Sequence, residues 1–313
     1  MRAATIRDGE VLVEEHPDPD PRGGEVLVRV RAAGLNGADM MQRRGLYPAP
    51  PGSPPDIPGL ELAGEVAALG PGAERFALGE RVMAIVAGGG QAELCVVHER
   101  QLMPVPSALE WLAAGGLPEV FTTAHDALFT QAQLHAGEHL LVHGGAGGVG
   151  TAAIQLARAA GARVTASVRR AELRGKVAAL GAAVIDPEGF AEHGPFDVIL
   201  ELVGAPNLSD DLQALAMGGR IVVIGVAAGA TGELNLLGLM AKRARIHGSM
   251  LRSRALEEKA LCARRIEHEV LPLFETGELR VPVAETCPLA DVAHAYERFA
   301  AGGKLGKIVL TMD

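Results

Sequence analysis

The chain has 313 residues, of which 48% are hydrophobic and 21% are charged, so it is long enough for two domains and too apolar to be disordered. Its 29 basic and 38 acidic residues give a net charge of −9, and aromatic residues make up 3%, which argues against duplex and single-stranded nucleic acid as partners. No apolar run is long enough for a membrane span, no signal segment opens the chain, and three scattered cysteines favour reduced thiols; we expect a cytoplasmic protein without a membrane partner.

The first third of the sequence predicts a β-rich domain. Residues 25–33 alternate apolar and polar side chains, as a half-buried strand does. Turns rich in proline and glycine separate further candidate strands, at 60–69, 80–87 and 92–97. The spacing of alanine and leucine then predicts helix over 107–134, broken or restarted at Pro118.

From residue 139 onward, predicted strands alternate with predicted helices. In chain order we expect strand 139–143, helix 149–160, strand 163–168, helix 171–180, strand 196–200, a helix near 208–216, and strands 220–224 and 245–250. This alternation is typical of an α/β fold with a doubly wound, parallel Rossmann sheet. The tail predicts a long helix, a helix at 289–300 and a last strand at 306–311.

The turn after strand 139–143 is rich in glycine. Gly145, Gly147 and Gly150 match the G-x-G-x-x-G pattern, in the strand–turn–helix context that this pattern requires. Glycine lets the main chain approach a pyrophosphate, and the N–H groups of the helix N-terminus bind its charge. The alternative is a glycine-rich turn without a ligand. The expected dinucleotide-binding residues are Gly145, Ala146, Gly147, Gly148 and Val149.

The end of the second Rossmann strand predicts which dinucleotide binds. An NAD site usually has an acidic residue there, about 20 residues past the glycines, to hold the ribose hydroxyls. Here the chain has Ser167, Val168, Arg169 and Arg170, and a guanidinium matches a 2′-phosphate in charge and geometry. We therefore predict NADPH as the cofactor, with Arg169 and Arg170 as a phosphate clamp beside Ser167. A solvated basic pair at the start of a helix is the alternative.

Several segments together resemble the quinone oxidoreductases, zeta-crystallin-like and p53-inducible, of the zinc-independent medium-chain dehydrogenases/reductases. The segments are 35–47 (LNGADMMQRRGLY), 59–65 (GLELAGE), 88–92 (GGGQA), 118–124 (PEVFTTA), 146–155 (AGGVGTAAIQ), 248–254 (GSMLRSR) and 306–310 (GKIVL). The resemblance implies a GroES-like catalytic domain over 1–121 and 253–313 and a Rossmann domain over 122–252, with the nicotinamide between them. It also implies an NADPH:quinone oxidoreductase whose substrate is a small quinone or enone.

The same resemblance implies roles for individual residues. Asn36, Tyr47 and Thr123 would line the nicotinamide and substrate side. Cofactor contacts would come from Gly225, Val226, Leu251 and Arg252, and Lys307 in the terminal GKIVL segment is counted with them. A homodimer paired through the edge strand at 245–250 is usual in the family. Two departures from the family pattern are Gly37, where a larger residue is common, and Glu201, where Asp is common.

The zinc-using relatives have a cysteine before the segment that matches 36–39 and a Gly-His-Glu that aligns with 59–61. This chain has Leu60 in place of that histidine and lacks the lobe with four closely spaced cysteines. A zinc site needs several Cys, His or carboxylate ligands converging on one ion. We therefore expect no metal, and we interpret His139, His143 and the cysteines Cys95, Cys262 and Cys287 as structural.

For the chemical step we expect Tyr47 to donate a hydrogen bond to a carbonyl oxygen of the acceptor and Asn36 to orient it. Tyr47 as a packing residue and Asn36 as a turn-stabilising amide stay open. The nearest alternative activity is an NADPH-dependent enoyl or alkenal double-bond reductase. A protein that binds NADPH without turnover is an alternative of another class.

Overall fold

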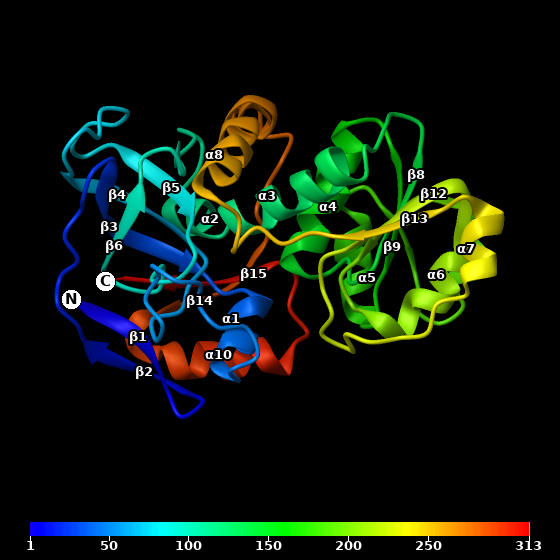
Figure 1. Ribbon diagram of the computed structural model, residues 1–313, viewed down its shortest axis with the longest axis horizontal. Coiled ribbons are helices and arrows are strands. Elements are labelled where there is room, and N and C mark those ends of the chain that lie inside the picture. Colours follow the sequence, from blue (N-terminus) through cyan, green and yellow to red (C-terminus); the bar gives the residue numbers. More distant parts are fainter. Residues whose placement is uncertain (313) are drawn as a thin grey trace. The chain divides into compact units, whose positions relative to one another are not determined.

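The computed structural model describes residues 1–312, which divide into two compact units (Figure 1). The first unit comprises Met1–Thr122, Leu251–Gly302 and the chain from Lys307 onward. The second unit comprises Thr123–Met250 and Gly303–Gly306. Within residues 1–312, no helix has the length and apolar character needed to cross a membrane.

The second unit is built on a parallel six-stranded sheet in the order β10-β9-β8-β11-β12-β13. Its strands are β8 (His139–Val142), β9 (Arg163–Ser167), β10 (Ala183–Ile185), β11 (Phe196–Glu201), β12 (Leu215–Val223) and β13 (Arg245–Gly248). Its helices include α4 (Gly148–Ala159), α5 (Ala171–Ala178), α6 (Leu208–Ala214) and α7 (Leu236–Lys242). The predicted α/β fold with a doubly wound parallel sheet is confirmed.

Side-chain alternation divides the core of this sheet between its two faces. Leu141 and Ile199 pack in one cluster with Phe190 and the side of α6, whereas Ala166 lies toward Ile154 of α4. Because neighbouring residues of a strand point to opposite faces, a parallel strand covered on both faces reads as a continuous apolar run, as LLV and VIL do here. This is why the strands could be recognised from the sequence.

The first unit is β-rich and contains a seven-stranded sheet in the order β14-β15-β3-β4-β5-β7, with β6 also paired to β3. Its strands are β3 (Glu25–Gly34), β4 (Glu61–Leu69), β5 (Arg81–Ile85), β6 (Leu94–His98), β7 (Leu102–Pro104), β14 (Val283–Pro288) and β15 (Lys307–Thr311). Its helices are α1 (Gly37–Arg43), α2 (Trp111–Gly115), α8 (Leu256–Arg265), α9 (Leu271–Glu275) and α10 (Val292–Ala301), while α3 (Pro118–His125) starts at the predicted Pro118. Antiparallel pairing of β15 with β3 brings the C-terminal residues beside Gly34.

A hairpin of β1 (Arg2–Arg7) and β2 (Glu10–Glu15) precedes this sheet and was not predicted. Asp8 and Gly9 form its turn, with φ angles of 50° and 83°. Two successive positive φ angles are what a two-residue turn of type I′ requires, and Asp-Gly is a favoured pair for it. The sequence therefore carried this signal, although the charged residues around the turn obscure the alternation of the strands.

Candidate functional site

The glycine loop joins β8 to α4 in the second unit. The helix begins at Gly148, and no side chain caps its N-terminus at Gly147. A Cβ at Gly145 would lie 2.8 Å from that of Ala166, and one at Gly150 would lie 2.5 Å from the carbonyl oxygen of Gly144, so internal packing requires glycine at both positions. At Gly147 a Cβ would meet only the Gly144 oxygen, at 3.4 Å. Internal packing leaves room for a side chain there, so this glycine fits a ligand that approaches the loop from outside.

The predicted phosphate-binding residues follow β9 beside this loop. The Gly145 N–H donates to the Ser167 carbonyl oxygen at 3.1 Å, which ties the loop to the end of β9. Arg169 and Arg170 are both exposed, and Arg170 forms an ion pair with Glu172 at 3.5 Å. The exposed pair lies at the carboxyl edge of the parallel sheet, the edge where such folds bind their ligands.

The segment Gly303–Gly306 belongs to the same unit and was missed by the sequence analysis. Its Gly306 N–H donates to the Ala146 oxygen at 2.8 Å, so the segment covers part of the glycine loop. Gly303 has a φ of 71°, and a Cβ there would lie 2.9 Å from the guanidinium carbon of Arg170. The sequence signal for this segment is the pair of glycines in the run AGGK. Gly302 and Gly303 both have positive φ angles, a conformation that favours glycine.

Glu201, at the end of β11, organises the next loop along the sheet edge. Its Oε1 accepts the N–H groups of Val203 and Gly204, and its Oε2 accepts the Asn207 side-chain amide at 2.9 Å. At the end of β12, a Cβ on Gly225 would lie 2.5 Å from the carbonyl oxygen of Leu202, so glycine is required where these loops meet. The adjacent Val226 is exposed.

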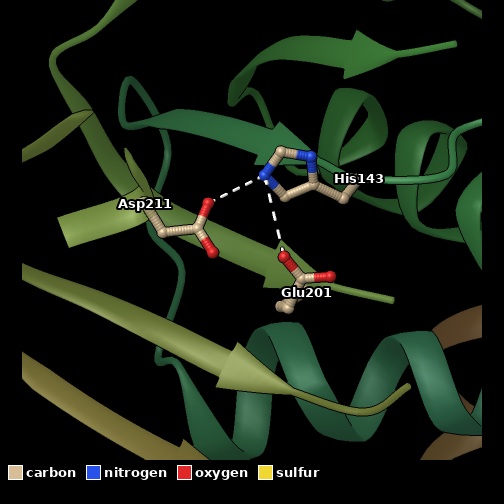
Figure 2. Close-up of side chains that lie close together, drawn as sticks. All are labelled: His143, Glu201 and Asp211. Carbon is tan, nitrogen blue, oxygen red and sulfur yellow. Dashed lines mark hydrogen bonds and ion pairs between the residues drawn. The ribbon is translucent and has the colours of Figure 1, made fainter. Parts of the chain in front are cut away.

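Beneath these loops lies a buried cluster of His143, Glu201 and Asp211 (Figure 2). His143 Nε2 is 2.8 Å from Asp211 Oδ1 and 3.9 Å from Glu201 Oε2, and its Nδ1 is 3.0 Å from the Ser167 hydroxyl. Burial lowers the pKa of His143, and it raises the pKa of Glu201 and the pKa of Asp211, the latter to about 7. Burial thus favours the neutral form of each group in this cluster. Asp211 was not singled out from the sequence.

Among the described residues, 1–312, this cluster is the one group of three His, Cys or acidic side chains close enough to hold a metal ion. Its geometry is that of a hydrogen-bonded network, because His143 Nε2 and Asp211 Oδ1 are at hydrogen-bond distance. Both oxygens of Glu201 already accept donors from its own loop. A metal ion would have to displace these bonds inside a fully buried site.

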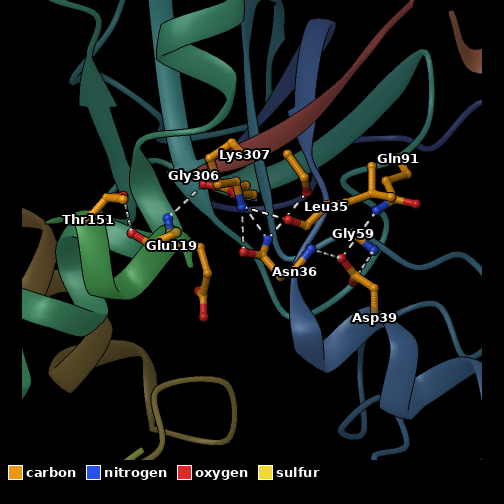
Figure 3. Close-up of polar contacts among 12 residues, drawn as sticks. Leu35, Asn36, Asp39, Gly59, Gln91, Glu119, Thr151, Gly306 and Lys307 are labelled. Carbon is orange, nitrogen blue, oxygen red and sulfur yellow. Dashed lines mark hydrogen bonds and ion pairs between the residues drawn. The ribbon is translucent and has the colours of Figure 1, made fainter. Parts of the chain in front are cut away.

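The first unit has a different buried network, centred on Lys307 (Figure 3). The Lys307 ammonium donates to the Leu35 carbonyl oxygen at 2.7 Å and to Asn36 Oδ1 at 2.6 Å, and it pairs with Glu61 Oε1 at 2.6 Å. Three acceptors satisfy the three N–H groups of a lysine. Lys307 was predicted to contact the cofactor; here its ammonium is fully used in holding Asn36 and Glu61.

The Asn36 amide is held on both sides. Its Nδ2 donates to Glu61 Oε1 at 3.0 Å, and a longer bond of 3.3 Å goes to the Gly34 oxygen, while its Oδ1 accepts from Lys307. Glu61 in turn accepts the backbone N–H of Glu119 at 2.8 Å. Asn36 therefore connects Lys307 to Glu61 in this network, and its predicted role in orienting the acceptor stays a prediction.

Asp39 completes the network at the start of α1. Its carboxylate accepts the Asn36 backbone N–H at 2.8 Å and the Gly59 N–H at 3.2 Å, as Figure 3 shows. The side chain is fully buried, and burial raises its pKa to about 6 although Lys307 acts in the opposite direction. Gln91 links Asp39 to the hydroxyl of the buried Tyr296.

Tyr47 is half-buried and lies against Arg252. The guanidinium is 5.0 Å from the centre of the Tyr47 ring and donates to the Tyr47 carbonyl oxygen at 2.9 Å. It also donates to the Ala87 oxygen at 2.8 Å and to Gln42 Oε1 at 2.6 Å. Burial raises the pKa of Tyr47, which keeps the phenol protonated and able to donate a hydrogen bond. Arg252, predicted as a cofactor contact, thus holds the tyrosine loop within its own unit.

The predicted site residues therefore fall into two groups. The second unit places 145–149, Ser167, the arginine pair and 225–226 at the carboxyl ends of its strands. The first unit joins Asn36 to Lys307 and Tyr47 to Arg252. Leu251 is buried in the first unit and Thr123 is buried on α3, and their cofactor contacts stay predictions.

Two protein-family models match the chain. The alcohol dehydrogenase GroES-like domain matches residues 22–130, and the zinc-binding dehydrogenase model matches residues 148–264. The quinone oxidoreductase of Rattus norvegicus is 32% identical over 306 residues, covering 94% of this chain and 91% of the relative. The chain belongs to the medium-chain dehydrogenase/reductase superfamily. It is an oxidoreductase of that superfamily, and the fold implies a nicotinamide cofactor.

Other relatives in the superfamily differ in reaction and cofactor. An acryloyl-coenzyme A reductase of Metallosphaera sedula is 31% identical over 332 residues, covering 96% of both chains. Among solved structures, a mycobacterial protein complexed with NADPH has a TM-score of 0.89 at 28% identity, and an NAD-dependent alcohol dehydrogenase has 0.88 at 28% identity, each covering 100% of both chains. The fold is shared by enzymes that use either dinucleotide.

Proposed function

We propose that this protein is an NADPH-dependent quinone oxidoreductase that works without zinc and transfers a hydride to a small quinone. The observation that carries the proposal is full-length similarity to quinone oxidoreductases, joined to the exposed Arg169–Arg170 pair at the end of β9 where NAD enzymes have an acidic residue. Bound NADPH would supply the hydride. The protein contributes binding, orientation and a hydrogen-bond donor.

In the second unit, the glycine loop and the N-terminus of α4 offer backbone N–H groups to the pyrophosphate. The Arg169 and Arg170 guanidinium groups would pair with the 2′-phosphate, which NADH lacks. Gly225 keeps the backbone of the neighbouring loop close to the sheet edge. These features favour binding of the phosphorylated dinucleotide.

In the first unit, Tyr47 would donate its hydroxyl proton in a hydrogen bond to the quinone oxygen that gains negative charge. Protons for the product oxygens come from water. Zinc-independence is supported by the residues that a metal ion would have to bind. The Lys307 ammonium already contacts the side chains of Glu61 and Asn36, and its positive charge would repel a divalent cation. Stoichiometric, activity-linked zinc in the purified enzyme would contradict this part of the proposal.

The cofactor proposal is tested by replacing both arginines with alanine. We expect the KM for NADPH to rise by at least tenfold in the Arg169→Ala/Arg170→Ala variant, with little change in the KM for NADH, because only NADPH has the 2′-phosphate. Arg163→Ala is the matched control, since Arg163 is an exposed arginine at the other end of β9. A wild-type enzyme that prefers NADH, or an unchanged KM for NADPH in the variant, would refute the clamp.

A second candidate is reduction of an activated carbon–carbon double bond, favoured by the 31% identity to an acryloyl-coenzyme A reductase. Comparing 9,10-phenanthrenequinone with crotonyl thioesters under NADPH absorbance separates the two activities. In either reaction Tyr47→Phe should lower kcat by tenfold or more, because a donor to the developing oxyanion is lost. Full turnover of the variant on both substrates would remove Tyr47 from the mechanism.

We also propose a homodimer that forms through β13. This strand is at the edge of the six-stranded sheet, and the neighbouring α7 exposes Leu236, Leu237 and Met240, with exposed fractions of 63%, 74% and 71%. An unpaired strand edge next to an apolar surface favours pairing with a second copy. Light scattering should give twice the chain mass, and Leu237→Glu/Met240→Glu should give the monomer mass. A wild-type monomer at micromolar concentration would contradict the dimer.

A further inference from the structure

A small cavity lies in the first unit among residues of β5, β7 and α8. Its volume is about 20 Å³, which is room for about one water-sized molecule. Most of the lining is apolar, and Gln101, Thr122, Lys259 and Cys262 are the lining residues that carry polar or sulfur atoms. The cavity therefore has room for one or two added atoms.

Thr122 lines this cavity, and its hydroxyl has no partner within residues 1–312. Thr122 is 3% exposed, and its Oγ1 makes no hydrogen bond. Leaving a buried hydroxyl unpaired is unfavourable, so native proteins usually pair such groups. An oxygen atom placed in the cavity would satisfy this hydroxyl.

Cys262 lines the same cavity, and its sulfur lies beside positive charge. Arg254 Nη1 donates to the Cys262 sulfur at 3.4 Å, and Lys259 lies one helical turn earlier on α8. The pKa of Lys259 is lowered by burial and by the charge of Arg252, so this ammonium gains from a negative neighbour. Cations next to a cysteine stabilise its thiolate, which is the nucleophilic form.

The other two cysteines have the opposite surroundings. Cys95 is buried, and burial raises its pKa to about 12. Cys287 is also buried, and burial together with the charges of Glu285 and Asp291 raises its pKa. Both sulfurs are kept in the unreactive thiol form and serve as internal controls.

We propose that Cys262 is a site of oxidation by hydrogen peroxide or a similarly small hydroperoxide. The thiolate sulfur attacks one peroxide oxygen, the S–O bond forms as the O–O bond breaks, and the leaving hydroxide takes a proton from solvent to become water. Sulfur is oxidised by two electrons to a sulfenic acid, and the peroxide is reduced. The new oxygen enters the cavity, where the Thr122 hydroxyl donates to it. This site is independent of the proposed quinone reduction.

The test exposes the folded protein to dilute hydrogen peroxide with dimedone and follows each cysteine peptide by mass spectrometry. We expect Cys262 to be labelled at least tenfold faster than Cys95 or Cys287. Arg254→Gln should slow the labelling at least fivefold, whereas Arg100→Gln, at an exposed arginine, should not. If Arg254→Gln fails to fold, Lys259→Gln tests the same charge effect. Labelling of Cys262 no faster than that of Cys287, or unchanged in the charge variants, would overturn the proposal.

The role of the cavity has its own test. Thr122→Val keeps the shape of the side chain and removes its hydroxyl. Without that donor, the sulfenic acid should convert to sulfinic acid at least threefold faster in excess peroxide, measured by the mass increase of the Cys262 peptide. An unchanged rate would show that the sulfenic oxygen does not use the cavity.

Discussion

Each of the two units buries carboxylates at the ends of its strands, but the two units compensate these groups differently. In the first unit Glu61 pairs at 2.6 Å with the ammonium of Lys307, and both side chains are fully buried. In the second unit Glu201 and Asp211 face His143, whose pKa is lowered by the same burial. Glu61 therefore has a cation at ion-pair distance, whereas in the histidine cluster burial favours the neutral form of each group.

Asp39, also in the first unit, has a pKa that burial shifts in the same direction as that of Asp211. It is fully buried without such a pair, and its pKa is raised to about 6, as the pKa of Asp211 is raised to about 7. Burial without a touching cation thus turns an acid into a group that titrates near neutral pH. We therefore expect the largest loss of unfolding free energy when a charge is removed from the Lys307 network. We expect a change of pH to act through Asp39 and Asp211.

The largest effect is expected from Lys307→Met. The substitution leaves Glu61 as a buried, unpaired carboxylate and also frees Asn36 Oδ1, and breaking a buried pair in this way costs about 3–5 kcal/mol of unfolding free energy. Urea unfolding at pH 7 measures it. The double variant Lys307→Met/Glu61→Gln removes both charges and should regain at least half of the loss. A loss below about 1 kcal/mol in the single variant would break the comparison.

The second largest effect is expected from Asp211→Asn, which should change the pH dependence of the unfolding free energy. The folded protein keeps a proton on Asp211 up to about pH 7, whereas the unfolded chain releases it near the ordinary pKa of 3.8. The folded state binds more protons across that window, so the unfolding free energy falls as pH rises from about 4 to about 7 and then stays level. Asparagine cannot ionise, so this fall should shrink by on the order of 2–4 kcal/mol.

The matched control for that variant is Asp210→Asn, at the exposed neighbour on α6. Denaturant unfolding of both variants and the wild type at pH 4.5 and 8 gives the comparison. If Asp211→Asn and Asp210→Asn have the same pH dependence, Asp211 does not carry the proton.

A smaller effect is expected from Ser167→Ala. It removes the hydroxyl 3.0 Å from His143 Nδ1 and leaves one buried ring nitrogen unpaired. The loss should be about 1–3 kcal/mol by urea unfolding. Thr165→Val, which removes the Thr165–His139 bond of 2.9 Å on the same strand, is the control outside the cluster. A fully stable Ser167→Ala protein would show that the cluster does not depend on this contact.

The smallest effect is expected from Arg100→Ala, which breaks an ion pair with Glu257 on the surface of the first unit. Both side chains are exposed to solvent, so the loss should be the smallest of this series and disappear in concentrated salt. The loss in Lys307→Met should persist in the same salt, because buried pairs are poorly screened. Equal salt dependence of the two variants would contradict the distinction between buried and exposed pairs.

Much of the second unit could be predicted from local sequence. Continuous apolar runs marked β8, β11 and β12, and the glycine pattern marked the loop between β8 and α4. The short β10, the helix α7 and the start of β12 at Leu215 were missed, because a three-residue strand or an exposed helix has no strong period. In the first unit, β14 was missed for a related reason, since parallel pairing with β15 and not its own pattern defines it.

The candidate site also contains features that local sequence predicts and features that it does not. Residues named from backbone requirements or from a motif, such as Gly147 and the Arg169–Arg170 pair, could be proposed from the sequence, and their cofactor contacts stay predictions. Contacts between residues far apart in the chain were not predicted: Asp211 lies 68 residues from His143, and Lys307 and Asn36, each named from the sequence, are paired across 271 residues. No local pattern shows that such polar residues meet in the core.

The amino-acid sequence by itself determined the α/β class, the glycine loop and the basic end of β9, because these depend on neighbours in the chain and on side-chain period. The tertiary structure alone decided which charges are compensated by an ammonium and which by a proton, and which cysteine lies beside cations. Burial and distance set the energy of a charge, and both arise only when segments remote in sequence pack together.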